Sequence, residues 1–186
     1  MNKNIFFKKT HKKILTQVVV TLGIITTILF ITLNRIDIHL QTSAAPKGIV
    51  SFELARTLAQ TEAILDSWNT DARLYAALSL GIDYLFLVLY SSFLFLLISK
   101  VSHTTENPAW IERFGNYIAQ LQILAGVFDA LENYFLLRLL FGMYSEIFSK
   151  LAFLFASLKF GFIALGILYM VAVLFLRIFK QTTKTI

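Results

Sequence analysis

Five polar side chains lie inside long apolar runs of the chain, where a polar group needs a specific reason to be present. They are Asp83, Asp129, Glu132, Asn133 and Lys159. Asp129, Glu132 and Asn133 have the i, i+3, i+4 spacing that places side chains on one face of a helix. Carboxylates near a lysine can bind a cationic group or carry a proton, and an Asp-x-x-Glu pair can also ligate Mg²⁺ through oxygen. Because one such pair is a weak metal signal, we predict a ligand-binding set and no metal site.

The cost of placing charge in a bilayer predicts where these side chains point. An ionised side chain at the middle of a membrane costs about 2.5–3.5 kcal/mol on insertion scales. We therefore expect all of them to face the interior of a helix bundle. Counted along their apolar runs at the helical rise per residue, their depths agree within about one helical turn. The sequence thus predicts one buried polar site that opens outward.

The charges of this predicted site do not balance. Lys159 neutralises one of the three carboxylates, which leaves a formal surplus of two acids. The surplus is removed if carboxyl groups are protonated, if a cation or cationic ligand is bound, or if an arginine reaches in from the mouth. The arginines near the mouth are Arg56, Arg73 and Arg138. The structural alternative is that a lysine–carboxylate pair with an asparagine simply locks three helices together.

The elements that must position these residues are four apolar helices. The chain has 186 residues, of which 57% are hydrophobic and 15% charged, and its mean hydropathy is +0.70. A soluble domain is usually nearer half apolar and a quarter charged. Runs of about 20 apolar residues are long enough to cross a bilayer. The predicted transmembrane helices cover residues 14–33, 76–98, 114–137 and 151–176. We therefore predict an all-α, polytopic membrane protein, with one membrane domain over residues 1–186 built as a four-transmembrane-helix bundle.

A cleaved signal peptide is the alternative interpretation of the first apolar run. The basic start of the chain and the small residues Ser43, Ala44 and Ala45 fit that alternative. However, the apolar core of a signal peptide usually has about 7–15 residues. The run over 14–33 is longer and ends ten residues before Ser43. We therefore predict that the first helix is a retained anchor.

The stretch over residues 49–68 has the pattern of one amphipathic helix in the first outer loop. At about 100° per residue its apolar and polar side chains separate onto two faces. The apolar face carries Val50, Leu54, Leu58, Ile64, Leu65 and Trp68, and the polar face carries Glu53, Arg56, Gln60 and Ser67. This helix is expected either to pack across the mouth of the bundle or to lie on the lipid surface. Glu53 and Arg56 would then form a lid over the site.

Cysteine and histidine usage excludes several kinds of site. The chain has no cysteine, which excludes disulfides, thiol redox chemistry, iron–sulfur ligation and thiolate zinc sites. Its three histidines lie outside the apolar runs, so a bis-histidine haem within the membrane is also excluded. No cofactor is therefore predicted.

The basic residues predict the orientation of the chain. The net charge is +6, and the lysines and arginines flank the apolar runs rather than form one basic face. We therefore expect the lipid bilayer, and not nucleic acid, as the partner of the chain. Ten lysines and arginines lie on the side of the two termini and six on the other side. The positive-inside rule then predicts a cell-membrane protein with both termini in the cytoplasm.

Several polar and aromatic motifs follow one another in a recognisable order. The chain contains Phe52-Glu53-Leu54-Ala55, Asp83-Tyr84-Leu85-Phe86 with Tyr90, Asp129-x-x-Glu132-Asn133, and Lys159. This order resembles that of a group of small, uncharacterised bacterial four-span integral membrane proteins, over about residues 50–176. The resemblance implies a four-helix fold and a role for these polar positions. It implies no particular activity.

Binding or transport is the function that these features predict first. We expect a small polar or lipid-headgroup ligand in an outward-facing acidic pocket within the membrane. Asp129 and Glu132 would hold the ligand's charge, Asp83 would complete the wall, and Lys159 would adjust the protonation of the three acids. Because four helices are few for a transporter, transport would favour a homodimer.

Two other classes of function remain as alternatives. The first is a structural or accessory membrane subunit whose buried charges fix helix packing. The second is a lipid-modifying enzyme that uses a carboxyl group as acid or base. No nucleophile, electrophile or metal motif supports the enzyme, so enzymatic activity is the less expected of the two.

Overall fold

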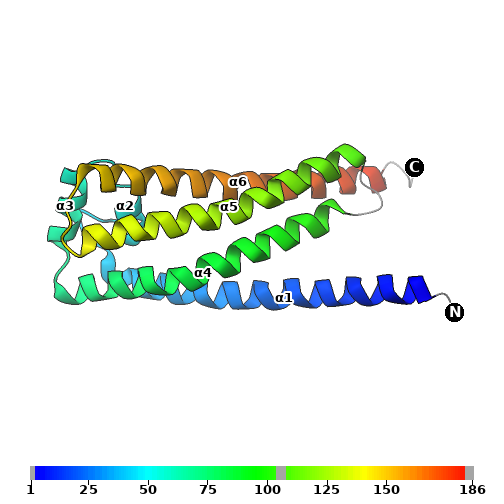
Figure 1. Ribbon diagram of the computed structural model, residues 1–186, viewed down its shortest axis with the longest axis horizontal. Helices are drawn as coiled ribbons and strands as arrows, with labels where there is room; N and C mark the ends of the chain where they lie inside the picture. The colour runs from blue at the N-terminus through cyan, green and yellow to red at the C-terminus, as the bar shows by residue number, and fades with distance from the viewer. Residues whose placement is uncertain (1–2, 104–107, 183–186) are drawn as a thin grey trace.

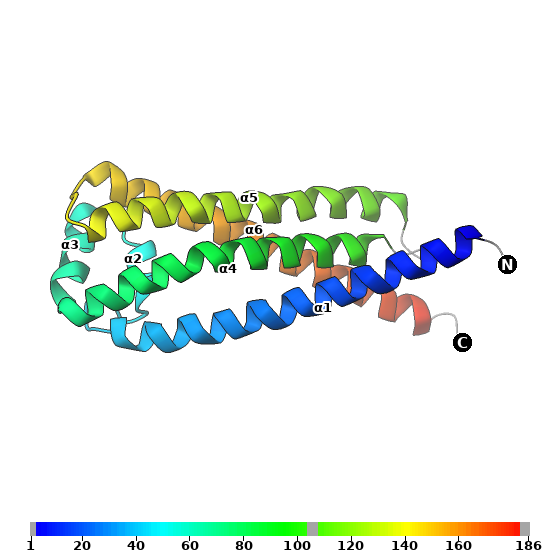
Figure 2. The same ribbon diagram turned by 60° about the horizontal axis from the view of Figure 1, so that its bottom comes forward.

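The computed structural model describes residues 3–103 and 108–182, and every secondary-structure element in this part of the chain is a helix. Its elements are α1 (Lys3–Asp37), the 3₁₀ helix η1 (Ile38–Leu40), α2 (Ile49–Glu53), α3 (Leu58–Ser67), α4 (Thr70–Ser102), α5 (Ala109–Leu140) and α6 (Glu146–Thr182). The four long helices, α1, α4, α5 and α6, run side by side, and α2 and α3 lie across one end of them, which we call the cap end (Figure 1). Helix α1 begins and α6 ends at the opposite end (Figures 1 and 2).

The all-α prediction is confirmed, and so is the apolar character of three of the long helices. The segments Lys13–Leu40, Thr70–Ser102 and Glu146–Ile178 are each long and apolar enough to cross a membrane, which points to membrane association. The predicted spans over 14–33, 76–98 and 151–176 lie within them. The fourth predicted span, over 114–137, lies within α5, which carries five charged residues and is not among the three.

Helix α5 packs between α4 and α6, whereas α1 packs chiefly against α4 (Figure 2). One face of α5 is buried along its whole length, because buried residues recur three or four positions apart from Ile111 to Leu140. Polar residues lie on this face together with apolar ones. The buried polar residues of α5 are Gln122, Asp129, Glu132 and Asn133. The fold therefore turns the polar side of α5 inward.

The prediction of one continuous helix over 49–68 is wrong, because the stretch forms α2 and α3 with a break between them. Thr57 has an extended backbone, and its hydroxyl accepts a hydrogen bond of 3.3 Å from the N–H of Gln60. The side chain of Gln60 in turn accepts a hydrogen bond of 2.9 Å from the N–H of Arg56. This reciprocal capping starts a new helix at Leu58. As a result the two faces expected for a single helix do not hold, and Glu53 is buried while Leu54 is exposed.

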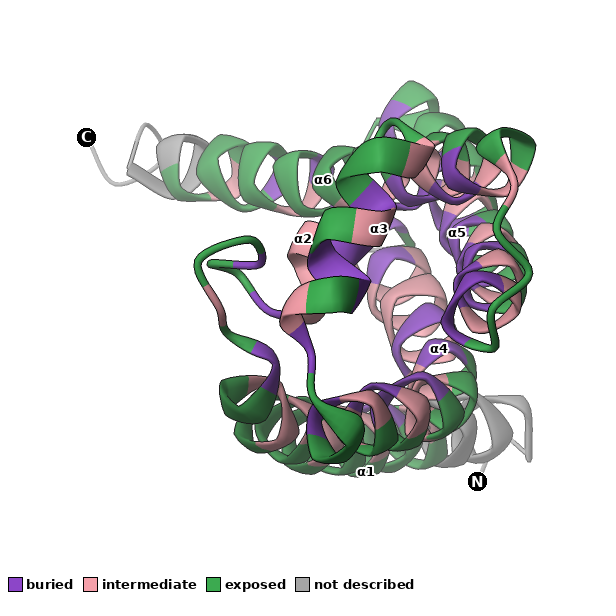
Figure 3. Ribbon diagram, turned by 90° about the vertical axis from the view of Figure 1, so that its left-hand side faces the viewer, coloured by how far each residue is buried: buried purple, intermediate pink, exposed green. Residues whose placement is uncertain are grey.

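The short helices are held tightly against the ends of the long ones. The indole N–H of Trp68 donates a 2.8 Å hydrogen bond to the carbonyl of Leu40, and the hydroxyls of Thr61 and Ser149 lie 2.9 Å apart in a buried position. Apolar side chains from η1, α2, α3, α4 and α5 fill the space between them. The view onto the cap end shows buried segments of α3 and α5 facing each other (Figure 3). The cap is thus a packed part of the fold, and it fixes the position of α2.

Gly48 allows the chain to pass from the end of α1 into α2. The Asp37 carboxylate at the end of α1 accepts a 2.6 Å hydrogen bond from the N–H of Ile49, the first residue of α2. Gly48 has φ +52°, in the left-handed region that glycine adopts without strain. A Cβ at this position would also overlap with the Asp37 carboxylate. Both the backbone conformation and the space at this turn therefore require glycine.

Replacing Gly48 with alanine is expected to destabilise the cap. Left-handed backbone costs a residue with a Cβ about 1–2 kcal/mol, and displacing the Asp37 carboxylate would add to this. Thermal unfolding in mild detergent measures the loss. Gly81→Ala is the matched control, since a Cβ at Gly81 meets no atom within 4 Å and the residue lies inside a helix. A Gly48→Ala protein as stable as the Gly81→Ala protein would contradict this account of the turn.

Candidate functional site

Lys159 of α6 lies at the centre of a buried cluster of charges. Its Nζ lies 2.8 Å from Asp129 Oδ1 and 2.9 Å from Glu132 Oε2, both on α5. The same atom lies 3.6 Å from Oε1 of Glu53 on α2. The ammonium donates a hydrogen bond to Asp129, whereas Glu132 is held at ion-pair distance without the angles of a hydrogen bond. One lysine therefore joins three elements of the fold through three carboxylates.

Asp83 makes its hydrogen bond to Asn133 rather than to Lys159. Asp83 Oδ2 accepts a 2.6 Å hydrogen bond from the side-chain amide of Asn133. On the same face of α4, two helical turns further on, the Tyr90 hydroxyl donates a 2.9 Å hydrogen bond to Asp129 Oδ2. The two hydrogen bonds join α4 to α5, as Lys159 joins α6 to α5. The structure thus brings together all five residues that the sequence singled out, in two connected groups.

Small residues let these helices approach closely enough for short side chains to meet. A Cβ on Gly126 of α5 would lie 2.9 Å from the Ser91 hydroxyl of α4, so glycine is needed where the two helices touch. On α6, Ala152 and Ala156 are fully buried on the face that also carries Lys159. The positions of Asp83, Asp129 and Lys159 therefore depend on the spacing of small residues as well as on polar contacts.

The two residues expected to form a lid separate in the structure. Glu53 is 8% exposed and contacts the Lys159 ammonium, so it belongs to the charge cluster itself. Arg56 is exposed, and its guanidinium lies 4.9 Å from the centre of the Phe153 ring on the outside of α6. The break between α2 and α3 explains the difference, because it ends the first helix at Glu53 and turns the chain away.

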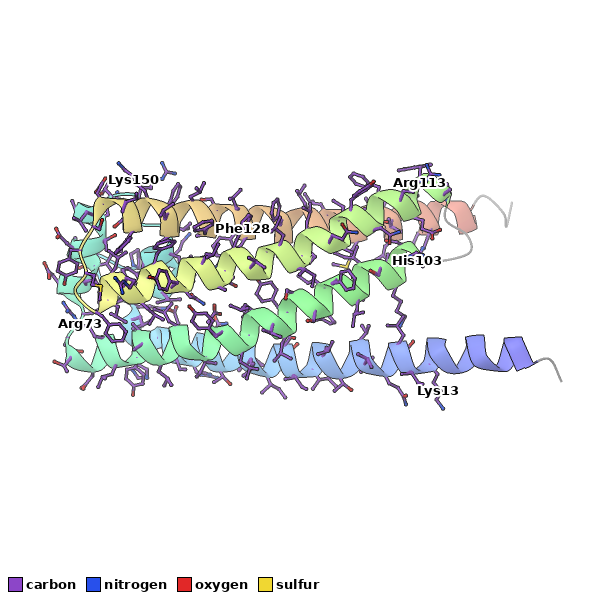
Figure 4. All side chains as sticks on the ribbon, in the orientation of Figure 1. Lys13, Arg73, His103, Arg113, Phe128 and Lys150 are labelled. Carbon is purple, nitrogen blue, oxygen red and sulfur yellow. The ribbon has the colours of Figure 1, made fainter. Side chains whose placement is uncertain are left out.

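None of the three arginines near the mouth reaches the cluster. Arg73 donates a 2.7 Å hydrogen bond to the carbonyl of Leu65 and lies at the cap end (Figure 4). The guanidinium of Arg138 lies 5.9 Å from the ring centres of Tyr134 and Phe148. With Arg56 on the outside of α6, neutralisation by an arginine is excluded as a source of charge balance in this structure.

A cavity of about 470 Å³ opens beside the cluster, between α1, α4 and α6, with α2 over its cap end. Its charged lining is formed by Asp37, Glu53, Asp83, Asp129 and Lys159, and further polar groups come from Thr26, Thr27 and Asn34 of α1. The rest of the wall is apolar and partly aromatic. Glu132 and Asn133 do not line the cavity, so they lie behind its wall. The volume is in the range of cavities that bind small molecules.

Some buried polar atoms at this site have no hydrogen-bond partner. Glu53 Oε2 and Thr26 Oγ1 belong to residues that line the cavity, and Asn133 Oδ1 lies behind its wall. A buried polar atom without a partner costs about 1–3 kcal/mol. Burial also raises the pKa of the Glu53 carboxyl above its ordinary value, against the lowering effect of the Lys159 ammonium. The unpartnered atoms are buried within or behind the cavity wall, so the wall is under-satisfied in hydrogen bonds there.

The charge imbalance is larger than the sequence predicted. The site now contains four carboxyl groups and one ammonium, which leaves a formal surplus of three acids instead of two. The additional acid is Glu53. Over the described residues, no group of three or more histidine, aspartate or glutamate side chains is arranged to hold a metal ion. The cluster is organised around the lysine ammonium.

The sequence does contain a signal for the helix break next to Glu53. Thr57-x-x-Gln60 has the spacing of a capping box, which predicts a new helix start. A helix break there separates Glu53 from the polar face that a continuous helix would give it.

Searches of protein families, of curated protein sequences and of solved structures each find no match to this chain.

Removal of the Lys159 ammonium is expected to destabilise the fold strongly. Breaking a buried ion pair by removing one partner costs about 3–5 kcal/mol, whereas replacing all partners is often neutral. Lys159→Met should therefore lower the free energy of unfolding by an amount of this order. The triple variant with Asp129→Asn and Glu132→Gln should regain most of the loss. Thermal and denaturant unfolding in mild detergent give both values.

Lys150→Met is the control for this series. Lys150 lies on the same helix, is exposed, and forms an i, i+4 ion pair of 3.2 Å with Glu146. Exposed pairs contribute about 0.3–0.5 kcal/mol, so this variant should stay close to the wild type. Asp83→Asn should have a smaller effect than Lys159→Met, because Asp83 does not contact the ammonium. Equal stability of Lys159→Met and Lys150→Met would show that the cluster does not hold the helices together.

Proposed function

We propose that the chain is an integral membrane protein of four spans, and that α5 crosses the bilayer in addition to the three apolar segments in α1, α4 and α6. The support comes from the exposed side of α5. Between residues 121 and 140 its exposed side chains are Ile123, Leu124, Val127, Leu131 and Tyr134. All of these are apolar or aromatic, and the polar residues of this segment are buried or half-buried. A helix with polar groups inside the bundle and apolar groups outside suits a lipid environment, although it is less apolar on average than α4 and α6.

The proposed orientation places the cap end outside the cell and the ends of the chain in the cytoplasm. Basic residues support it by their number, ten against six. Lys13, His103 and Arg113 lie at the end where α1 begins, and Arg73 and Lys150 lie at the cap end (Figure 4). In this orientation α2 and α3 together take the place of the amphipathic helix expected in the first outer loop.

Single cysteines would test the four spans directly, because the chain has no cysteine of its own. We expect Ser43→Cys and Met143→Cys in intact cells to react with a maleimide that cannot cross membranes. His103→Cys, at the other end of α5, should react only after the cells are permeabilised. Labelling is read as a mass shift on a gel.

The comparison of His103→Cys with Met143→Cys decides whether α5 crosses the bilayer. Similar labelling of both in intact cells would mean that α5 begins and ends on one side, and the four-span proposal would fall. Opposite labelling with His103→Cys outside would keep four spans and reverse the orientation. Blocking with an impermeant thiol reagent before permeabilisation controls for leaky cells.

We propose that this membrane protein binds a small polar or lipid-headgroup ligand in the cavity beside the charge cluster. The observation that carries the proposal is a cavity of about 470 Å³ whose wall, over the described residues, carries the carboxylates of Glu53, Asp83 and Asp129 but only one ammonium, that of Lys159. A bound cationic group would balance that excess of acids. Transport of the ligand would require a second open state of the protein, and it would favour a homodimer.

Part of the cluster supports a structural role at the same time. Asp129 and Glu132 both contact Lys159, so they act as a lock between α5 and α6. Asp83 and Glu53 line the cavity and are less closely tied to the ammonium. We therefore assign ligand binding to Asp83 and Glu53, and helix packing chiefly to Asp129 and Glu132, with Asp129 also part of the cavity wall. The accessory-subunit alternative needs only the second set.

Native mass spectrometry of the purified protein would test ligand binding. We expect the wild type to retain a small molecule that Asp83→Asn and Glu53→Gln lose, because both variants remove a carboxylate from the cavity wall. Asp66→Asn is the matched control, since Asp66 is exposed on α3 and far from the cavity lining. The same spectrum for all four proteins, with or without a bound mass, would argue against this cavity and favour the accessory role.

A further inference from the structure

We propose that the ligand of this cavity is a cationic amphiphile, a molecule with one ammonium head group and a hydrocarbon chain. This inference rests on the proposed ligand-binding function and adds the chemical class of the ligand. It starts from the cavity wall as a whole, where an excess of carboxylates meets an apolar and aromatic surface. Neither half of the wall alone identifies the ligand.

The sign of the charge follows from the residues of the cluster. Glu53, Asp83 and Asp129 line the cavity together with Lys159, and Glu132 lies directly behind them. A buried charge without a counterion is costly, so a bound cation lowers the free energy of this arrangement. An anion would face the opposite effect. The half-buried Asp83 carboxylate, with Glu53 beside it in the wall, gives an ammonium N–H, or the methyl groups of a quaternary ammonium, a place to bind.

Head groups that contain phosphate do not fit the same wall. Among the described residues that line the cavity, Lys159 is the one cation, and its ammonium already contacts three carboxylates. A phosphate would add a negative charge beside them with no donor of positive charge to receive it. The wall therefore selects ligands of net positive charge over zwitterionic phospholipid head groups.

The apolar part of the wall requires a hydrocarbon portion in the ligand. It is formed by Phe30, Leu33, Ile49, Val50, Phe86, Phe93, Leu94, Phe160 and Ile163. The rings of Phe30 and Phe86 lie 6.4 Å apart and those of Phe86 and Tyr90 lie 5.3 Å apart, next to the carboxylates. Aromatic faces beside carboxylates attract ammonium groups by cation–π interaction. The apolar part of the wall suits a chain of methylene groups.

An amphiphile can reach this cavity from the side of the bundle. Phe30 and Thr27 of α1 line the cavity and are exposed as well, so the cavity reaches the outside of the bundle along α1. Helix α1 is almost wholly unburied over its apolar stretch. In the proposed membrane setting, this side of α1 faces lipid chains. A molecule whose chain lies in the bilayer would thus enter with its head group toward Asp83 and Glu53.

Three probes test the proposal on the protein in lipid nanodiscs, two with the same hydrocarbon chain and one with no chain. They are dodecyltrimethylammonium below its micelle concentration, dodecylphosphocholine with the same chain, and tetramethylammonium with no chain. We expect saturable binding of dodecyltrimethylammonium by isothermal titration, and at least about tenfold weaker binding of the other two. Empty nanodiscs give the partition of each probe into lipid. This ranking needs no variant, so it does not depend on the folding of a mutant.

Variants then locate the binding. Asp83→Asn and Glu53→Gln should each weaken dodecyltrimethylammonium binding by about tenfold, the loss of one charged contact, and Asp66→Asn should leave it unchanged. Equal affinity for dodecylphosphocholine and dodecyltrimethylammonium would overturn the cationic class. If Asp83→Asn still weakened the binding of both probes, the proposed ligand-binding function would stand without this inference. The absence of saturable binding of any probe would contradict both the ligand-binding function and the cationic class.

Cationic lipids of the membrane and cationic amphiphiles from the water share this chemistry. Protein purified without probe separates the two sources by the positive-mode mass spectrum of its lipid extract. A lipid of net positive charge that dodecyltrimethylammonium displaces indicates a membrane source. Full titration of the cavity without any displaced lipid indicates an external source. Displacement of a zwitterionic or anionic lipid instead would contradict the proposal.

Discussion

The ion pairs of Lys159 determine how α2, α5 and α6 meet. A primary ammonium that is 5% exposed needs carboxylates next to it, and Asp129 and Glu132 lie at 2.8 Å and 2.9 Å from its nitrogen. Such pairs contribute little to stability relative to apolar packing, but they permit only one alignment of the helices that carry them. Shifting α5 by one turn against α6 would cost the ammonium at least one of its two partners on α5, because Asp129 and Glu132 lie about one turn apart. The position of the cavity follows from this alignment.

The same requirement explains why α5 is less apolar on average than α4 and α6 and still has an apolar outer side over residues 121–140. Its buried polar residues lie at the spacing of one helical face, and that face is turned to α4 and α6. A hydropathy average over α5 combines the buried carboxylates with the exposed leucines, so it does not show that they lie on different sides. The i, i+3, i+4 spacing of Asp129, Glu132 and Asn133 does show that the polar residues share one face. Hence the sequence could predict that these three residues share a face, although composition alone would not place α5 with the other apolar helices.

Local patterns predicted the long helices and the shared polar level, but they could not predict which partners meet. Asn69 caps α4, since its side chain accepts a 2.8 Å hydrogen bond from the N–H of Ala72. By contrast, the pairing of Asp83 with Asn133 depends on the rotation of α4 about its own axis, which tertiary packing sets. Glu53 reaches Lys159 because α2 ends at Glu53 and a separate helix, α3, begins after Thr57. These are contacts between elements far apart in the sequence, so no periodicity within one element contains them.

A structural lock accounts for only part of the charge at this site. One ammonium needs one carboxylate for neutrality, and Asp129 with Glu132 already exceeds that number. Asp83 and Glu53 add two further acids on the cavity side, and Glu53 Oε2 is buried without a hydrogen-bond partner. Asp83 bonds Asn133 and Glu53 contacts Lys159, but these contacts are not sufficient reason for two more charges, because apolar residues of similar size would pack the same space with lower desolvation energy. A cation that enters and leaves the cavity supplies the reason, since it neutralises the surplus when bound and leaves the lock of α5 and α6 in place when it is gone.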